Sequence, residues 1–167
     1  NMNNILKKGG MSIATLFDAE LIVKLLGKNK SYKSEYTDEE GNKNTLFEIV
    51  NSYGDIKNLN QTGLPIDVYM SWLSEENTYI TEFLVSKEFM IKTLKEKCNM
   101  RLIETQTFHN LYEINKPFFM DTVQHEESTR LKIFYEKVKK FYEQESQLDK
   151  ESKVYSDLFR YYIFQKM

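Results

Sequence analysis

The strongest constraint on the fold is a change of pattern near the start of the chain. Residues 11–17, MSIATLF, are a short apolar run typical of a strand. Residues 18–27, DAELIVKLLG, have helical spacing, with Asp18 as the N-cap and Gly27 as the stop. Residues 2–10 read as the last turns of an earlier helix and a glycine pair that ends it. Helix, strand and helix in succession indicate an α/β sheet with helical crossovers.

The rest of the chain is divided by turn residues and by two periodicities. Gly41 and Asn42 suit a hairpin turn between two polar strands. After Pro117 the pattern becomes that of a long charged helix, whose lysines are expected on a solvated face. Strands are expected at 30–36, 44–53, 64–73, 100–108 and 158–167, with an apolar run at 79–85 and helices at 86–99 and 126–146.

Composition limits the class of protein and its surroundings. The chain has 167 residues, enough for one domain or part of one, and a net charge of −2, which argues against a protein that coats nucleic acid. Any nucleic-acid contact should be local. Cys98 is the only cysteine, so no intrachain disulfide is possible and a reducing compartment is expected. His109, His125 and Cys98 lack the spacing of a zinc site, so no metal site is expected.

The sequence also bears on membranes. It contains no long uncharged apolar stretch of about 20 residues and no signal-peptide pattern at its start. We therefore expect a soluble, intracellular protein that does not bind a membrane.

Three ordered segments resemble a known family. They are LKKGGMSIATLFDAELIVKLL, then YITEFLVSKEFMIKTLKEKCNMRLIETQTFHNLYE, then RYYIFQK. Together they resemble the C-terminal half of the mRNA cap guanine-N7 methyltransferases, in particular those in the capping enzymes of large DNA viruses. The resemblance implies the C-terminal part of a class I, Rossmann-like α/β methyltransferase, in which the LK-GG turn leads into the fifth strand and the aromatic strand closes the sheet as its antiparallel last strand. An antiparallel hairpin at about 30–54 and helices at about 117–153 are expected to be insertions.

The chain departs from this family in one large respect. A class I methyltransferase binds S-adenosylmethionine through a glycine-rich loop after its first strand. Here the only adjacent glycines, Gly9 and Gly10, end a helix. The resemblance therefore implies that S-adenosylmethionine is bound mainly by residues outside this chain, on an upstream methyltransferase half or a companion subunit.

Glu82 is the residue to which the resemblance gives the clearest role. The EFLV element of the family opens a helix beside the cap pocket, here expected over 83–98. Guanine presents N–H donors on N1 and N2, which a carboxylate can accept as a pair. Methylation at N7 makes the purine cationic, so a nearby negative charge favours the transition state. N7 already carries the attacking lone pair, so no catalytic acid or base is expected. The alternative is a carboxylate that merely favours a helix start.

Further cap-guanine contacts are expected from flat side chains. On the last strand, Phe159 or Tyr161 is the candidate, depending on the register, with ordinary strand packing as the alternative. Tyr69 and Ser71 lie on the strand before TEFLV, and Tyr69 belongs either to the pocket or to the core. His109 is expected to be a solvent-facing turn residue rather than a base.

The expected substrate is a capped or guanylylated RNA 5′ end. Lys28, Lys30 and Lys33 could contact its triphosphate, although a solvated loop is the simpler interpretation. Two other functions stay open: a non-catalytic methyltransferase-like segment that binds a partner subunit or RNA in a capping complex, and a class I methyltransferase with another substrate. The expected location is the cytoplasm, or a viral factory or virion if the protein is viral.

Overall fold

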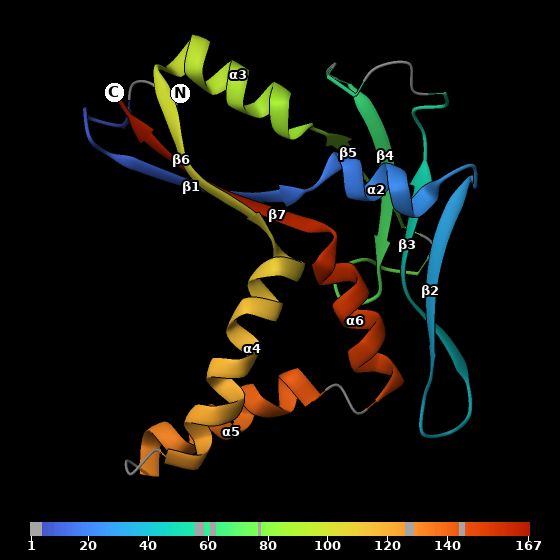
Figure 1. Cartoon of the computed structure of the whole chain (residues 1–167). Helices are drawn as coiled ribbons and strands as arrows, with labels where there is room; N and C mark the ends of the chain where they lie inside the picture. Colours follow the sequence, from blue (N-terminus) through green and yellow to red (C-terminus); the bar gives the residue numbers. More distant parts are fainter. Residues whose placement is uncertain (1–4, 56–58, 61–62, 77, 126–128, 144–145) are drawn as a thin grey trace.

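The protein contains two antiparallel sheets that meet at one end, and a helical arm that extends away from them (Figure 1). The structure is a computed structural model, and it describes residues 5–55, 59–60, 63–76, 78–125, 129–143 and 146–167. The elements in chain order are β1 (Met11–Phe17), α2 (Ala19–Leu26), β2 (Ser31–Thr37), β3 (Lys43–Asn51), β4 (Leu64–Met70), β5 (Ile80–Leu84), α3 (Lys87–Cys98), β6 (Met100–Thr107), α4 (Phe108–His125), α5 (Thr129–Glu143), α6 (Gln147–Asp157) and β7 (Phe159–Lys166).

The first sheet has three strands in the order β1-β7-β6, and β7 is antiparallel to both neighbours. Strands β1 and β6 therefore run in the same direction, and both end where β7 begins. At that end Phe17 pairs with Phe159, and Thr107 pairs with Arg160. One face of this sheet is covered by α3, because Leu94 of that helix belongs to the same buried cluster as Tyr162 and Phe164 of β7.

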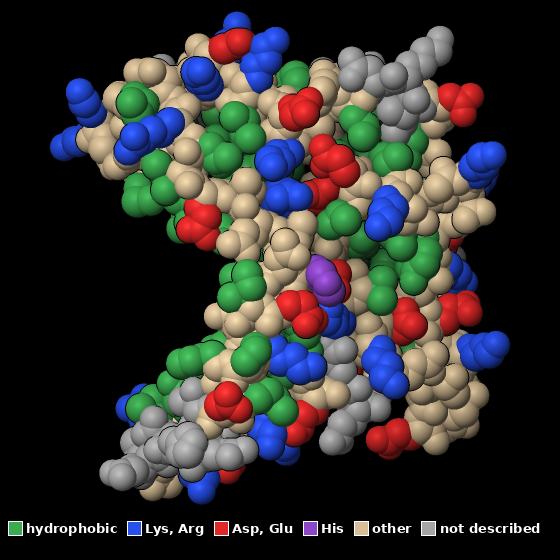
Figure 2. Space-filling view, viewed as in Figure 1, with side chains coloured by type: hydrophobic (Ala, Val, Ile, Leu, Met, Phe, Trp, Pro, Cys, Tyr) green, Lys and Arg blue, Asp and Glu red, His purple; other side chains and the backbone are tan. Residues whose placement is uncertain are grey.

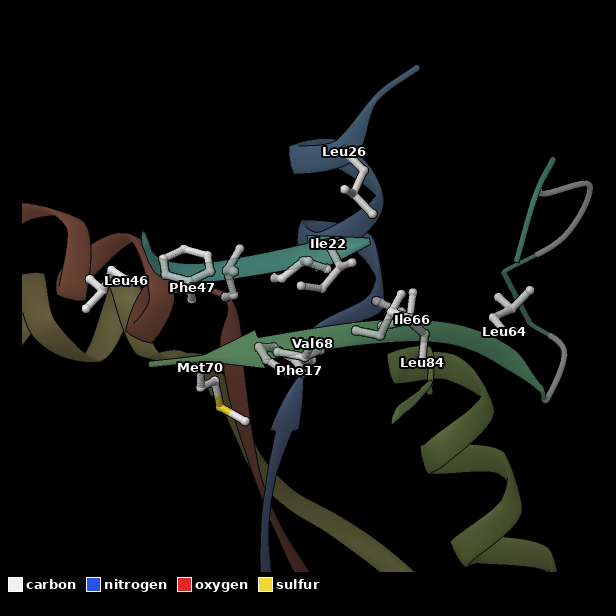
Figure 3. Packing of buried hydrophobic residues seen from close by; sticks show 13 residues of the cluster. Phe17, Ile22, Leu26, Leu46, Phe47, Leu64, Ile66, Val68, Met70 and Leu84 are labelled. Carbon is white, nitrogen blue, oxygen red and sulfur yellow. The ribbon is translucent and has the colours of Figure 1, made fainter. Parts of the chain in front are cut away.

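The second sheet has four strands in the order β2-β3-β4-β5. Alternate residues of β4 (Leu64, Ile66, Val68 and Met70) are buried, which defines an inner face of the sheet. Helix α2 covers this face: Figure 3 shows its apolar side chains pointing toward those of β4, and both groups belong to one buried cluster. The outer face carries the intervening residues, including Tyr69.

The two sheets are joined where β1 ends. The backbone of Asp18 forms a parallel bridge with Val85, just after β5, and its N–H donates to the carbonyl of Leu158, just before β7, at 2.8 Å. The ends of β1 and β5 and the start of β7 therefore lie together. This junction positions the candidate site.

The remaining helices form the arm. Tyr112 of α4 packs on Tyr142 of α5 with ring centroids 4.5 Å apart, and its hydroxyl donates to the Tyr142 carbonyl at 2.9 Å. Helix α6 returns to the four-stranded sheet, where the Ser34 hydroxyl donates to Glu151 at 2.7 Å. Figure 2 shows the molecule hollowed between the α4–α5 pair and the three-stranded sheet. Within the described residues, no helix has both the length and the apolar character that a membrane crossing requires.

Most of the elements expected from the sequence are confirmed. Helix α2 begins after Asp18, whose side chain accepts from the Leu21 N–H at 3.1 Å, and ends at Gly27. The hairpin β2–β3 turns at Gly41, which has φ 86°, a conformation that favours glycine. Helix α3 and strands β6 and β7 lie where the sequence predicts them.

Other expectations are wrong. Helix α2 is not a crossover within one sheet, because it leads from β1 of the first sheet to β2 of the second. Strand β4 ends at Met70, not residue 73, and the EFLV element lies on β5 and its end rather than at a helix start. Pro117 does not bound a helix; it lies inside α4. The architecture is mixed α/β with antiparallel sheets. That it is half of a Rossmann-like sheet stays a prediction.

Candidate functional site

Glu82 points toward the interior side of the four-stranded sheet. It pairs with Ile66 across the β4–β5 ladder, and Ile66 is completely buried. Its strand neighbour Phe83 faces the other way and is 62% exposed, as the alternation of a strand requires. Burial raises the pKa of Glu82 above the ordinary carboxyl value. A carboxylate is thus held on the face that otherwise builds the core.

The Glu82 charge affects the pKa of one aromatic residue, Tyr155 of α6. Burial, followed by the Glu82 charge, raises the pKa of Tyr155 to about 12. Its hydroxyl donates to the sulfur of Met70 at 2.9 Å, and its ring lies edge-on to Trp72 with centroids 5.0 Å apart. Sequence patterns do not reveal Tyr155, because only tertiary packing brings α6 to β3 and to the end of β4.

Phe159 belongs to the same aromatic cluster. Its ring centroid lies 4.3 Å from that of Phe17, 5.3 Å from Tyr155 and 5.9 Å from Phe108. Three of these rings come from the carboxyl end of β1, the first residue of α4, which directly follows β6, and the start of β7. Phe159 therefore packs directly on Tyr155, and the Glu82 charge contributes to the raised pKa of the same tyrosine.

An ion pair fixes the start of β7 beside this cluster. The guanidinium Nε of Arg160 donates to the carboxylate of Asp18, a residue that is only 1% exposed. Burial alone raises the pKa of Asp18, but hydrogen bonds with Glu20, Arg160 and the Leu21 N–H lower it below the ordinary value. Asp18 was expected only as an N-cap; the ion pair gives it a second contact, with a residue that follows Phe159 directly.

Tyr161 lies elsewhere. It pairs with Thr15 and Gln106, on the face of the three-stranded sheet opposite to the one that α3 covers. Its hydroxyl donates to Glu104, which raises the pKa of Tyr161. Phe159 and Tyr161 share one face of β7, because they are two positions apart, but they lie at different points along it. Phe159 is at the start of the strand, where its ring packs on Tyr155, and Tyr161 lies farther along, where it contacts Glu104.

Tyr69 and Ser71 are also separated from Glu82. Tyr69 pairs with Glu48 and faces outward, and both Tyr69 and Ser71 line a cavity of about 430 Å³ on the outer face of the four-stranded sheet. The structure thus divides the five predicted residues among three places. His109 was expected in a turn between elements, but it lies in the first helical turn of α4. Its Nδ1 is 3.0 Å from the Asp157 carboxylate, and its side chain is half exposed.

The chain's own residues do not fit S-adenosylmethionine binding. In a doubly wound sheet the glycine-rich loop follows the carboxyl end of a strand. Gly9 and Gly10 precede β1 at its amino end. A side chain added at Gly9 would meet nothing within 4 Å, and one added at Gly10 would meet the Lys7 carbonyl oxygen at 2.9 Å, so the space at Gly10 is taken by the chain's own turn. No step is therefore assigned to this cofactor on these residues. Among the residues described, no group of three or more His, Cys, Asp and Glu side chains comes together to hold a metal.

The cluster can perform recognition rather than acid–base catalysis. It offers one carboxylate with a raised pKa, Glu82, on the inner face of the four-stranded sheet, and a group of aromatic rings where β1 and β6 end and β7 begins. Ligands of open α/β sheets bind outside the carboxyl ends of strands. A flat ring with N–H donors on one edge fits the chemistry of this arrangement.

Comparison with known proteins shows a similarity to part of one much longer protein. No family model matches the sequence. The chain is 38% identical over 177 residues to a probable mRNA-capping enzyme of Acanthamoeba polyphaga mimivirus. The aligned region covers 99% of the chain but only 15% of that enzyme. The chain is therefore related to one region of a probable mRNA-capping enzyme.

Proposed function

We propose that this chain supplies the guanine side of an mRNA cap guanine-N7 methyltransferase. The observation that carries the proposal is the position of Glu82: a carboxylate on the inner face of β5 whose charge contributes to the raised pKa of Tyr155, a residue that in turn packs on Phe159 with ring centroids 5.3 Å apart. The relationship to a region of a probable mRNA-capping enzyme supports a role in capping. The antiparallel strand β7 between β1 and β6 supports the second half of a methyltransferase sheet, since such sheets often carry an antiparallel strand near one edge.

The guanine would lie against the aromatic rings with its N1 and N2 edge toward Glu82. Hydrogen bonds to a charged group contribute about 1.5–3 kcal/mol. The same negative charge favours the methylated, cationic purine, and this effect is stronger in a partly dry site than in water. Glu82 would therefore both select guanine and stabilise the transition state, while N7 itself acts as the nucleophile.

The methyl group would come from S-adenosylmethionine held by residues outside this chain. The chain's own residues would fix the purine: Glu82 orients its edge, and Phe159 and Tyr155 restrict the plane of its ring. Because N7 already carries the attacking lone pair, holding the nucleophile in line is sufficient and no base is needed.

A second candidate function is supported by a separate surface. Strand β1 forms one edge of the three-stranded sheet, with Met11 54% and Ile13 71% exposed. An exposed apolar edge is open to pairing with another strand. A non-catalytic segment that binds a partner subunit in a capping complex would use this edge and would need no cap pocket.

Calorimetric titration with the cap dinucleotide GpppG and with ApppA tests the first proposal. We expect GpppG to bind more tightly, because adenine lacks the N1 and N2 donor pair. Glu82→Gln should weaken GpppG binding about tenfold to a hundredfold, while Glu39→Gln, an exposed carboxylate in the hairpin turn, should have no effect. Equal affinity of Glu82→Gln and the unaltered chain for GpppG would reject the assignment, and absence of GpppG binding would favour the partner-binding function.

A further inference from the structure

The outer face of the four-stranded sheet carries an ordered row of polar and aromatic side chains. Lys33 of β2 pairs with Glu48 of β3, and Glu48 pairs with Tyr69 of β4. The three side chains therefore lie next to one another across three strands. They line the cavity of about 430 Å³, together with Lys43, Ser71 and Tyr79.

Two tyrosines form one wall of this cavity. The ring centroids of Tyr69 and Tyr79 lie 5.9 Å apart, with their planes inclined at 50°. The Tyr79 hydroxyl donates to Glu48 Oε2 at 2.7 Å, and this hydrogen bond raises the pKa of Tyr79 to about 12. The hydrogen bond from Tyr79 therefore holds the Glu48 carboxylate in place through Oε2.

Two lysines add positive charge to the same cavity, whose lining also includes the carboxylate of Glu76. Lys33 and Lys43 are both exposed, and they come from β2 and from the start of β3. Lys33 lies 3.4 Å from the Glu35 carboxylate, and this pair is itself half exposed. Lysine ammonium groups at the rim of an aromatic cavity suit a phosphate attached to a flat ring.

We propose that this cavity binds one nucleotide of a single-stranded RNA. Aromatic side chains on the open face of an antiparallel sheet stack unpaired bases, which is a general mode of RNA recognition. Here Tyr69 stacks the base, Tyr79 closes the same wall and holds Glu48, Glu48 accepts from the exocyclic amino group of the base, and Lys33 and Lys43 contact the adjacent phosphates. Adenine, guanine and cytosine carry such an amino group and uracil does not, so the site discriminates against uracil.

This site is distinct from the proposed cap pocket. Glu48 and Tyr69 are on the outer face of the sheet, whereas Glu82 is on the inner face. The choice of an RNA strand rather than a free nucleotide rests on the proposed function in capping. The presence of a nucleotide site on the outer face does not depend on it.

Fluorescence anisotropy with 5′-labelled, uncapped A8 and U8 RNA tests the proposal. We expect A8 to bind more tightly than U8. Tyr69→Ala should weaken A8 binding at least about fivefold, as expected for loss of one stacking partner, and Tyr69→Phe should retain it. Lys43→Glu should weaken binding and reduce the slope of log affinity against log salt by about 0.7. Lys95→Glu, a matched change on the exposed side of α3, should do neither.

The outcomes separate this inference from the cap proposal. Unchanged A8 affinity in folded Tyr69→Ala and Lys43→Glu variants would overturn it, as would an equal loss in Lys95→Glu. Tight binding of AMP, matching that of A8, would assign the cavity to a free nucleotide and overturn the RNA assignment. Glu82→Gln should weaken GpppG binding and leave A8 binding unchanged, so that a failed cap proposal does not affect this test.

Discussion

Glu82 and Tyr69 lie on neighbouring strands and point to opposite faces of one sheet. Glu82 is opposite Ile66 in the β4–β5 ladder, and Tyr69 is opposite Glu48 in the β3–β4 ladder. Because successive side chains of a strand alternate between the two faces, no change of rotamer can bring the two together. A single pocket that contains both residues is therefore ruled out in this fold, and the two belong to separate surfaces.

The position of Glu82 predicts an unusual dependence of stability on pH. Burial raises its pKa, so the folded protein holds the Glu82 proton more tightly than the unfolded chain does. The contribution of Glu82 to the free energy of unfolding is thus largest below the pKa that Glu82 has in the unfolded chain, and it is lost as pH rises through the raised pKa of the folded protein. Glu82→Gln should remove this loss, so its melting temperature at pH 7 should equal or exceed that of the unaltered chain. Thermal melts between pH 4 and 8 would show this.

The matched control for this prediction is Glu39→Gln, an exposed carboxylate in the turn between β2 and β3. It should leave the pH profile unchanged. A Glu82→Gln variant that melts well below the unaltered chain at pH 7 would mean that the ionised carboxylate stabilises the fold, and Glu82 would then be a structural residue.

Local signals are sufficient for the elements that the sequence predicts correctly. Asp18 and Gly27 delimit α2, and Gly41 marks the hairpin, because each of these residues acts within a few positions of itself. The family resemblance places the start of α3 too early. Ser86, whose side chain accepts from the Phe89 N–H at 3.1 Å, is the N-cap signal that places it correctly.

The site itself depends on contacts between distant parts of the chain. Tyr155 reaches Met70, and Arg160 reaches Asp18, across 85 and 142 positions respectively. Neither contact leaves a periodic pattern in the sequence. Helix α4 continues through Pro117 although proline disfavours helix interiors, so a local rule gave the wrong boundary there. This helix, which contains Pro117, packs against α5 through the rings of Tyr112 and Tyr142.

Phe159 and Tyr161 should respond differently to truncation. Phe159 packs against Phe17, Tyr155 and Phe108, so Phe159→Ala should lower the free energy of unfolding by about 2–4 kcal/mol and also weaken GpppG binding. Tyr161→Ala removes one hydroxyl contact with Glu104 on an open face and should cost about 1 kcal/mol or less. Denaturant unfolding and cap titration measure both effects, and Phe159→Leu should restore most of the stability.

Equal, small effects of the two truncations would mean that the start of β7 does not contribute to the pocket. A loss of cap binding in Tyr161→Ala alone would place the cap farther along β7, near Glu104, rather than at the start of the strand.

The ion pair between Arg160 and Asp18 predicts the largest loss of stability. Asp18 is 1% exposed, so Arg160→Met leaves a buried carboxylate without its cation and should cost about 3–5 kcal/mol near pH 7. The pKa of Asp18 is lowered in the folded state, so this contribution is present above the unfolded pKa and is lost as pH falls through the folded pKa. The difference between Arg160→Met and the unaltered chain should therefore shrink in acid. Urea unfolding at pH 7 and pH 4 makes the comparison, and an Arg160→Met loss that does not change with pH would show that Arg160 acts through packing rather than through the Asp18 charge.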